Sequence, residues 1–327
     1  MSTPAFVSSK IRIAPVRSEF GSDVRQGLTR AGQKELHSKY FYDDLGTALF
    51  QAITLLPEYG LTRADTRILR EYAPQIVERA ARPALIAELG SGTGEKTRFI
   101  LEAMLARQGS VRYCPIDVSQ AALHHCQREI ESFAEVRPIL GSYLPGIRSA
   151  AELRAPGEHL MVLFLGSTLG NFEPHCAREF LKELHSLLSP GDCLLLGVDL
   201  VKPVAQLLAA YDDALGVTAA FNLNILSRVN TELNANFELR QFQHEARYND
   251  EKQRVEMHLR SKIAQRVVIP GAGCAVDFAA GETIWTESSH KYQLSQVDEM
   301  ADTNGFRVQA QWVDREWPFV ESLWAAI

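Results

Sequence analysis

Three glycines at alternate positions, with an acidic residue just before them, form the stretch of this chain whose residue types could do chemistry. Gly90, Gly92 and Gly94 follow an apolar run over residues 84–89, and Glu88 stands two residues before the first glycine. Glycine permits positive φ and lets backbone N–H groups approach a ligand without a Cβ in the way. A helix expected directly after the loop would direct the positive end of its dipole into the same space. The pattern predicts a strand, a tight turn and a helix that hold a nucleotide-like ligand.

A second acidic residue, Asp117, ends the next strand that the sequence predicts, about 20 residues beyond the glycine loop. A carboxylate in this place accepts hydrogen bonds from both hydroxyl groups of a ribose. An Asp at the end of a strand can instead cap the following helix, here residues 119–133. The combination with Glu88 and the three glycines favours the ligand-binding interpretation.

The spacing of the glycines separates three classes of nucleotide site. Nicotinamide-dependent oxidoreductases use Gly-x-Gly-x-x-Gly, and the third glycine of that motif is missing here. Lys96-Thr97 does not complete a P-loop, because the glycine spacing before it is wrong. The order Glu-x-Gly-x-Gly-x-Gly over residues 88–94 resembles the first motif of class I methyltransferases that use S-adenosylmethionine (SAM), a donor without phosphate groups.

Strands and helices alternate around this loop. Strands are expected at residues 84–89, 111–117, 136–143, 159–165 and 192–199, and helices at residues 97–107, 119–133 and 173–188. The alternation predicts an α/β fold with a doubly wound, Rossmann-like parallel sheet. In such a sheet, ligands bind at the carboxyl ends of the strands.

The flanking segments are expected to build a substrate lobe. Further helices are expected at residues 23–36, 45–56, 64–81, 202–215, 219–233 and 294–304, an alternating strand or hairpin arm at 255–269, and a final strand at 306–313. We divide the chain into an N-terminal helical segment that contributes to the substrate lobe (1–80), a SAM-binding core (81–200), an inserted substrate-binding lobe (201–285) and a C-terminal part that returns to the core sheet (286–327). Residues 1–20 are expected to form a loosely held arm.

Composition argues against several other classes of protein. The 327-residue chain has a formal net charge of -6, which does not indicate a nucleic-acid-binding surface. Its five cysteines include no Cys-x-x-Cys pair, and the adjacent His124 and His125 diverge on one helix, so no metal site is expected. Residues 1–10 show no signal peptide and no apolar window is long enough to span a membrane. We expect a monomeric, cytoplasmic enzyme whose partner is a small molecule.

Several longer stretches carry a more specific resemblance. They are Phe-Tyr-Asp (41–43), Leu-Pro-Glu-Tyr (56–59), Glu-Leu-Gly-Ser-Gly-Thr (88–93), Phe-Leu-Gly-Ser-Thr-Leu-Gly-Asn (164–171), Ala-Tyr-Asp-Asp (210–213), Gly-Val-Thr-Ala-Ala-Phe-Asn (216–222), Asp-Phe-Ala-Ala-Gly-Glu (277–282) and Thr-Glu-x-Ser (286–289). Through them the chain, from about residue 23 to 315, resembles the histidine-specific methyltransferases, whose reaction belongs to ergothioneine biosynthesis.

This resemblance implies roles for individual residues. The residues expected on the donor side are Gly90, Lys96 and Asp117, with Ser142 and Tyr143 near the adenine, and Glu88 and Gly92 as members of the loop motif. The residues expected on the acceptor side are Tyr59, Asn171 and Tyr211 around the amine and carboxylate, Glu287 and Ser289 at the imidazole, and Tyr42 and Met257 lining the same pocket. Tyr42 and Asn171 are the residues expected to take part in catalysis. A carboxylate and a hydroxyl that bind both ring nitrogens would discriminate strongly against analogues that lack them.

Two positions depart from the pattern of the family. Ser142 stands where the family commonly has an Asp that accepts from the adenine amino group. Gly60-Leu61 follow Tyr59, where the family often has a second Tyr and then Pro. A hydroxyl at position 142 can still accept one hydrogen bond.

The reaction implied is methylation of the α-amine of histidine, and repeated transfer would give the trimethylated betaine. Because the donor methyl group is already activated, the main task is alignment of the amine lone pair, which can contribute about 7–11 kcal/mol. No His or Lys is evidently placed as a base, so we expect the amine proton to leave to water or through a tyrosine. Within the same chemistry, the alternative is another amino acid or a histidine derivative as the acceptor. Outside it, the alternatives are a nicotinamide-dependent oxidoreductase and a binding protein without catalytic activity.

Overall fold

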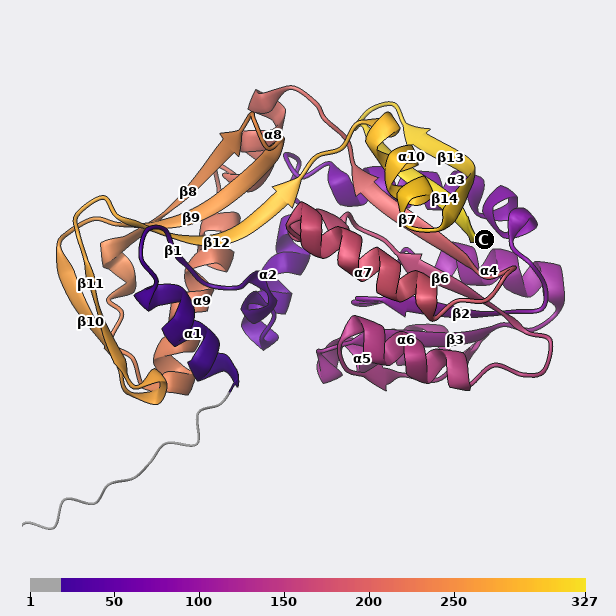
Figure 1. Cartoon of the computed structure of the whole chain (residues 1–327), viewed down its shortest axis with the longest axis horizontal. Coiled ribbons are helices and arrows are strands. Elements are labelled where there is room, and N and C mark those ends of the chain that lie inside the picture. Colours follow the sequence, from indigo (N-terminus) through magenta and orange to yellow (C-terminus); the bar gives the residue numbers. More distant parts are fainter. Residues whose placement is uncertain (1–18) are drawn as a thin grey trace, which may run out of the picture.

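The computed structural model describes residues 19–327, and Figure 1 shows their division into two parts joined by crossing segments. The arm expected over residues 1–20 lies outside the described residues apart from Glu19 and Phe20. Residues 1–10, where no signal peptide is expected, also lie outside them. In the part of the chain that is described, no helix is both long and apolar enough to cross a membrane.

The larger part is built on an eight-stranded sheet within residues 19–327. Its strands are β2 (Ala84–Leu89), β3 (Arg112–Asp117), β4 (Glu135–Val136), β5 (Ile139–Leu140), β6 (His159–Phe164), β7 (Cys193–Asp199), β13 (Phe306–Asp314) and β14 (Phe319–Ala326). Their order is β13-β14-β7-β6-β2-β3-β4, with β5 also paired to β3, and β2 to β7 are parallel. This confirms the predicted α/β class and the doubly wound core.

The far edge of this sheet differs from the prediction of one last strand over residues 306–313. A second strand, β14, lies between β7 and β13 and is antiparallel to both. All eight of its residues are buried. The adjacent polar residues Glu321 and Ser322 interrupt its apolar run, which explains why the sequence pattern did not reveal a buried strand.

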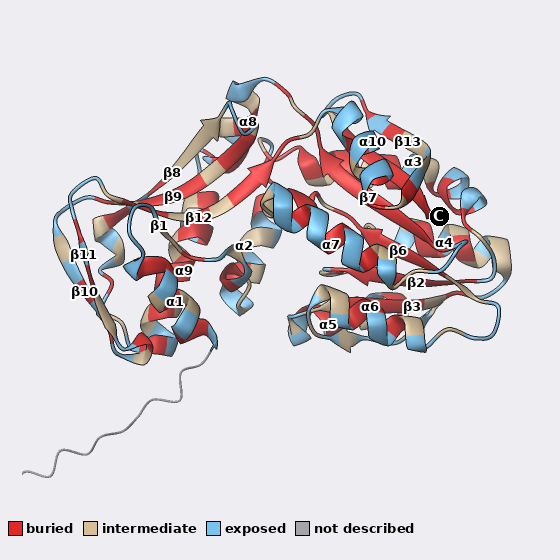
Figure 2. Ribbon diagram, viewed as in Figure 1, coloured by how far each residue is buried: buried red, intermediate tan, exposed pale blue. Residues whose placement is uncertain are grey.

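Helices cover both faces of the core sheet, and Figure 2 shows the buried strands between them. The helices on one face are α3 (Leu61–Arg79), α4 (Arg98–Gln108) and α5 (Gln120–Ile130), and those on the other are α6 (Tyr143–Glu152), α7 (Pro174–Ser186) and α10 (Leu294–Thr303). The last helix of the N-terminal segment, α3, therefore packs on the core sheet, whereas the helices before it belong to the smaller part.

The smaller part contains a four-stranded sheet in the order β1-β12-β9-β8 and a separate hairpin, β10-β11. Its strands are β1 (Lys34–Glu35), β8 (Phe242–Asn249), β9 (Arg254–Ser261), β10 (Gln265–Ile269), β11 (Cys274–Phe278) and β12 (Thr283–His290), and its helices are α1 (Glu19–Thr29), α2 (Asp44–Thr54), α8 (Val204–Tyr211) and α9 (Val217–Leu233). The arm expected over residues 255–269 is two strands with different partners, because β9 pairs with β8 and β12 while β10 pairs with β11. The boundary expected at residue 285 falls inside β12, so the smaller part extends to His290.

The segments that cross between the two parts pack against one another. Leu200 and Tyr292 form a parallel bridge, and the N–H of Tyr292 donates to the carbonyl of Asp199 at 3.0 Å. Gly60, where α2 leads into α3, packs under the Trp317 ring: a Cβ at this position would lie 2.2 Å from a ring atom. The glycine that departs from the family pattern is therefore required by this contact.

Candidate active site

The order of strands in the core sheet reverses beside β2, which places a ligand crevice at the carboxyl ends of β2 and β6. The glycine loop follows β2 there, and all three of its glycines have positive φ (69°, 53° and 75°). At Gly94 a Cβ would lie 2.7 Å from the Cys126 sulfur on α5, so the loop can pack this closely only without a side chain. A Cβ at Gly92 would meet nothing within 4 Å, so its backbone borders open space that a donor can enter.

Asp117 anchors the loop from the end of β3. Its carboxylate accepts the N–H of Gly92 at 3.1 Å and the N–H of Ser119 at 2.9 Å, and the residue is still partly exposed. The cap of α5 is Ser119, whose hydroxyl accepts the N–H of Ala122 at 3.2 Å. The capping role weighed for Asp117 thus falls to Ser119, and Asp117 stays partly exposed at the carboxyl end of β3.

Tyr143 and Ser142 close the other side of this crevice at the start of α6. A Cβ at Gly90 would lie 3.5 Å from the Tyr143 hydroxyl oxygen, and the Tyr143 ring lies 5.4 Å from that of Phe164. Burial, with a further contribution from the Asp117 charge, raises the pKa of Tyr143 to about 12. Ser142 is exposed at the N-cap position and its side chain makes no capping bond, so its hydroxyl is available to a ligand.

Glu88 lies beneath the loop rather than in the crevice. It is 1% exposed, and its carboxyl group accepts the Thr97 hydroxyl at 2.7 Å and the Tyr113 hydroxyl. Burial raises the pKa of Glu88 from 4.5 to about 7. These contacts connect the end of β2 to the start of α4, so we propose that Glu88 supports the donor site by fixing the loop.

This buried acid makes stability depend on pH in a defined direction. The unfolded chain releases the Glu88 proton near pH 4.5 and the folded chain near pH 7, so folding becomes less favourable as pH rises between these values. Glu88→Gln lacks this contribution. All other titratable groups are the same in the two proteins, so their contributions cancel when the variant is subtracted from the wild type. We expect the free energy of unfolding of the wild type to fall relative to the variant by up to about 3 kcal/mol between about pH 5 and about pH 8. Urea unfolding of both proteins measures this, and parallel pH curves would show that Glu88 does not titrate in this range.

Lys96 occupies the junction of the loop with α3 and β6. Its ammonium group lies 2.5 Å from the carboxylate of Asp65, which also accepts the N–H of Gly166 at 3.1 Å. Although burial lowers the pKa of Lys96, the Asp65 charge more than offsets this and the net pKa is raised. The predicted contact of Lys96 with the donor is not tested by this structure and stays a prediction.

The acceptor side is assembled where β12 meets the turn after β6. Asn171 ends the short 3-10 helix Thr168–Asn171, and its amide donates to the Glu287 carboxylate at 3.3 Å. A Cβ at Gly170 would lie 3.0 Å from the carbonyl oxygen of His290, so the glycine permits this close approach. The structure therefore brings together two residues, one from each part, that the resemblance assigned to the same substrate.

The strand β12 presents its functional side chains on one face. Its pairing with β9 shifts register between Trp285 and Glu287, and Glu287 then lies opposite Met257. Because alternate residues of a strand share a face and directly opposed residues are neighbours, Glu287, Ser289 and Met257 line the same surface. Burial raises the pKa of Glu287 to about 7.

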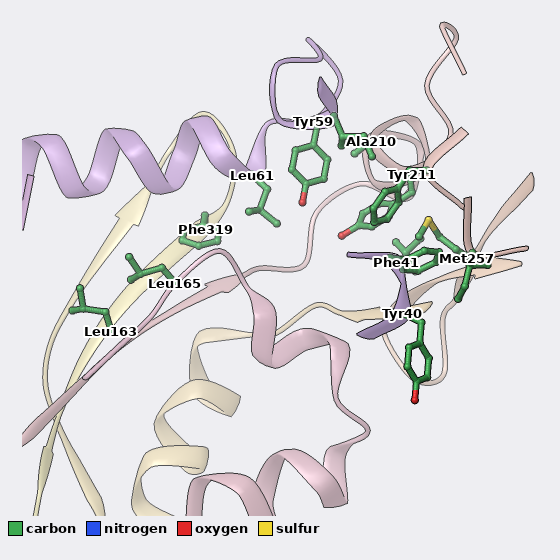
Figure 3. Close-up of a cluster of buried hydrophobic side chains, with 14 of the residues drawn as sticks. Tyr40, Phe41, Tyr59, Leu61, Leu163, Leu165, Ala210, Tyr211, Met257 and Phe319 are labelled. Atoms are coloured by element: carbon green, nitrogen blue, oxygen red, sulfur yellow. The ribbon is translucent and has the colours of Figure 1, made fainter. Parts of the chain in front are cut away.

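Aromatic side chains complete this surface. Figure 3 shows Tyr59 beside Tyr211, with their ring centroids 6.2 Å apart, and the Tyr211 hydroxyl donates to Ser289 at 2.7 Å. Burial is the main cause that raises the pKa of Tyr42, Tyr59 and Tyr211 well above 10, and the Glu287 charge contributes in each case. Tyr40 does not belong to the site, because its hydroxyl donates to Asp23 on α1 at 2.8 Å.

Two aromatic residues of this surface were not predicted. Phe221 on α9 and Phe50 on α2 form a cluster of three rings with Tyr42: their centroids lie 5.9 and 5.7 Å from that of Tyr42 and 6.0 Å from each other. Phe50 also lies 6.4 Å from Tyr59. Phe221 falls within a stretch that carried the resemblance (216–222), which was a signal that could have placed it here.

The sheet order, the glycine loop and the carboxylate at the end of β3 together define a class I SAM-dependent methyltransferase. The loop, Asp117, Ser142 and Tyr143 present open backbone, a partly exposed carboxylate and a free hydroxyl, which fit this donor. A family model for histidine-specific, SAM-dependent methyltransferases matches residues 20–326, and the chain belongs to this family. It is an enzyme, and SAM is its methyl donor.

Relatives with assigned functions support this placement. The chain is 44% identical to the histidine N-alpha-methyltransferase of Mycolicibacterium smegmatis and 41% identical to that of Mycobacterium tuberculosis, in each case over 92% of this chain and 93% of the relative. It is also 27% identical to an L-tryptophan methyltransferase of Psilocybe serbica, over 90% of this chain and 89% of that protein. Similar proteins therefore methylate more than one amino acid.

Proposed function

We propose that this enzyme transfers methyl groups from SAM to the α-amine of L-histidine and continues to the trimethylated betaine, as in ergothioneine biosynthesis. The observation that carries the proposal is the placement of Asn171 against Glu287, with Ser289 on the same face of β12. A carboxylate and a hydroxyl on one face match the two nitrogens of an imidazole ring. The two relatives above 40% identity, both named for histidine, support the same acceptor.

The donor, when bound, supplies a methyl group on a sulfonium, and the chain's own residues position the amine. Asn171 offers an amide to the amine or carboxylate of the acceptor, and Tyr59 and Tyr211 offer hydroxyl groups. With their raised pKa values these tyrosines are neutral phenols at neutral pH, so they accept an amine N–H but do not keep its proton. Tyr42 is a neutral phenol for the same reason, and we propose that water carries the proton away.

The reaction product distinguishes this proposal from its rivals. Incubation with SAM and histidine is expected to give mono-, di- and trimethylated products in mass spectrometry. Histidine derivatives and other amino acids, tryptophan included, form the comparison set. Methylation of one of these with none of histidine would overturn the acceptor, and failure to bind S-adenosylhomocysteine would overturn methyl transfer from SAM altogether. The cytoplasmic location, the monomeric state and the lack of a nucleic-acid partner stay predictions.

The raised pKa of Glu287 predicts a pH dependence of histidine use. At a pKa of about 7 the group is a carboxylate above that pH and an uncharged acid below it. Since a carboxylate accepts the imidazole N–H more strongly than an uncharged acid does, kcat/KM for histidine should fall as pH drops through about 7. Glu287→Gln cannot titrate, so its profile should lack this limb and keep only the ionisations of the substrate and of the other residues. Identical profiles for the two proteins would contradict the role of Glu287.

A further inference from the structure

A buried lysine lies directly behind the two hydroxyl groups of the acceptor site. Lys291 follows β12 by one residue and is 2% exposed. Its ammonium nitrogen lies 2.8 Å from the Ser289 oxygen, 2.9 Å from the Tyr211 oxygen and 2.9 Å from the Asp199 carboxylate. The Asp199 carboxylate lies between two buried ammonium groups, because Lys202 also donates to it at 2.6 Å.

The three groups form a closed triangle, because the Tyr211 and Ser289 oxygens are themselves 2.7 Å apart. An ammonium group can only donate, so it fills one lone pair on each oxygen. A phenol is more acidic than an aliphatic alcohol and is the better donor, so Tyr211 donates to Ser289. The Ser289 oxygen then accepts two hydrogen bonds, one from Tyr211 and one from Lys291. Its own proton cannot be donated to either of these two groups, because each already directs a proton at Ser289. That proton must point out of the triangle, to the face that Ser289 shares with Glu287.

We propose, on the basis of the function above, that Lys291 is a positioning residue that makes Ser289 a fixed donor to the ring of the acceptor, opposite Glu287 as the fixed acceptor. The site then offers one hydrogen-bond acceptor, Glu287, and one donor, Ser289. This pair matches a neutral imidazole, which has one N–H and one nitrogen without a proton. A ring that offers only an N–H, such as pyrrole or indole, leaves the Ser289 proton without a partner in a buried place. Lys291 is thus a determinant of specificity although it lies behind the residues that meet the ring.

Pyrrolylalanines test this directly, because each keeps one N–H and replaces the bare nitrogen by C–H. The pyrrol-2-yl and pyrrol-3-yl isomers cover both orientations of the ring, and the tighter of the two is compared with histidine. Calorimetry in the presence of S-adenosylhomocysteine should give a preference of the wild type for histidine of roughly 30-fold or more. In Lys291→Met the Ser289 hydroxyl can donate to the Tyr211 oxygen once the Tyr211 proton turns away from it, so Ser289 is no longer fixed as a donor to the ligand. We therefore expect this preference to fall by about 10-fold, mainly because the pyrrole binds better.

Lys202→Met is the matched control. Lys202 is also buried and donates to the same Asp199 at 2.6 Å, but it contacts neither hydroxyl, so its loss should leave the preference unchanged. Tyr211→Phe is a second test that preserves shape: it removes the oxygen to which Ser289 would turn its proton, so adding Lys291→Met to Tyr211→Phe should not lower the preference further. S-adenosylhomocysteine affinity reports whether each variant is folded.

The outcomes separate this proposal from the one on which it rests. If the wild type does not bind histidine, the proposed acceptor is wrong. If it binds histidine and the preference over pyrrole is the same in folded Lys291→Met as in the wild type, Lys291 does not set the polarity of Ser289. A fall in preference that Lys202→Met reproduces would also overturn the assignment, because it would follow from disturbance of Asp199 alone.

Discussion

Replacement of Glu287 by alanine is expected to lower kcat/KM for histidine by about 100-fold or more, with little change in donor affinity. Hydrogen bonds to a charged group contribute about 1.5–3 kcal/mol, and the imidazole N–H would be left without an acceptor in a buried site. The Asn171 amide would lose its partner at 3.3 Å as well, so the residue beside the amine would be less well oriented. Both effects act on the acceptor, because Glu287 lies on β12 and the donor residues lie on the core sheet.

Steady-state kinetics with histidine and calorimetry with S-adenosylhomocysteine measure the two sides separately. Ser288→Ala is the matched control, since Ser288 is the next residue on the same strand, points to the opposite face, and its hydroxyl has no hydrogen-bond partner among the described residues. Its activity should stay close to that of the wild type. Equal losses of histidine turnover and donor binding in Glu287→Ala would mean that the residue supports the fold rather than the acceptor.

The donor half of the site could be predicted from the sequence because it is local. A buried strand, three glycines and an acid two residues before them are neighbours in the chain, and the structure keeps them so in β2 and the loop. The position of Asp117 follows from the order of a doubly wound sheet. What the pattern could not tell is that Glu88 turns beneath the loop toward Tyr113, because side-chain direction depends on the packing of β3 against β2.

The acceptor half depends on contacts between distant segments, and the sequence predicted it only through the family resemblance. Glu287 meets Asn171 across 116 positions of the chain. Asp199, Lys202 and Lys291 gather where two crossing segments pair, and nothing in their spacing indicates this. The strand β14 was missed because Glu321 in its middle is an acidic residue, which sequence patterns place at the surface. In the structure Glu321 is buried, and burial raises its pKa well above the ordinary value.

Asp117→Ala is expected to have the largest effect on the donor, a loss of S-adenosylhomocysteine affinity of about 100-fold to 1,000-fold. We propose that its carboxylate accepts two ribose hydroxyl groups, each a charge-assisted hydrogen bond of about 1.5–3 kcal/mol. It also accepts the N–H groups of Gly92 and Ser119, so the variant leaves the loop less well held. Asp117→Asn keeps one acceptor oxygen and should retain an intermediate affinity.

Calorimetry with S-adenosylhomocysteine and with its dideoxyribose analogue separates ribose binding from loop support. The wild type should bind the analogue much more weakly than the parent compound, and Asp117→Ala should bind both with similar, low affinity. Asp302→Ala, an exposed carboxylate on α10 with the same change in net charge, is the control and should bind as the wild type does. If Asp117→Ala still discriminated between the two ligands, the ribose would be recognised by another group and Asp117 would act only on the loop. If it did not discriminate but kcat recovered at saturating SAM, Asp117 would serve donor affinity alone, since we propose that Asn171, Tyr59 and Tyr211 align the amine.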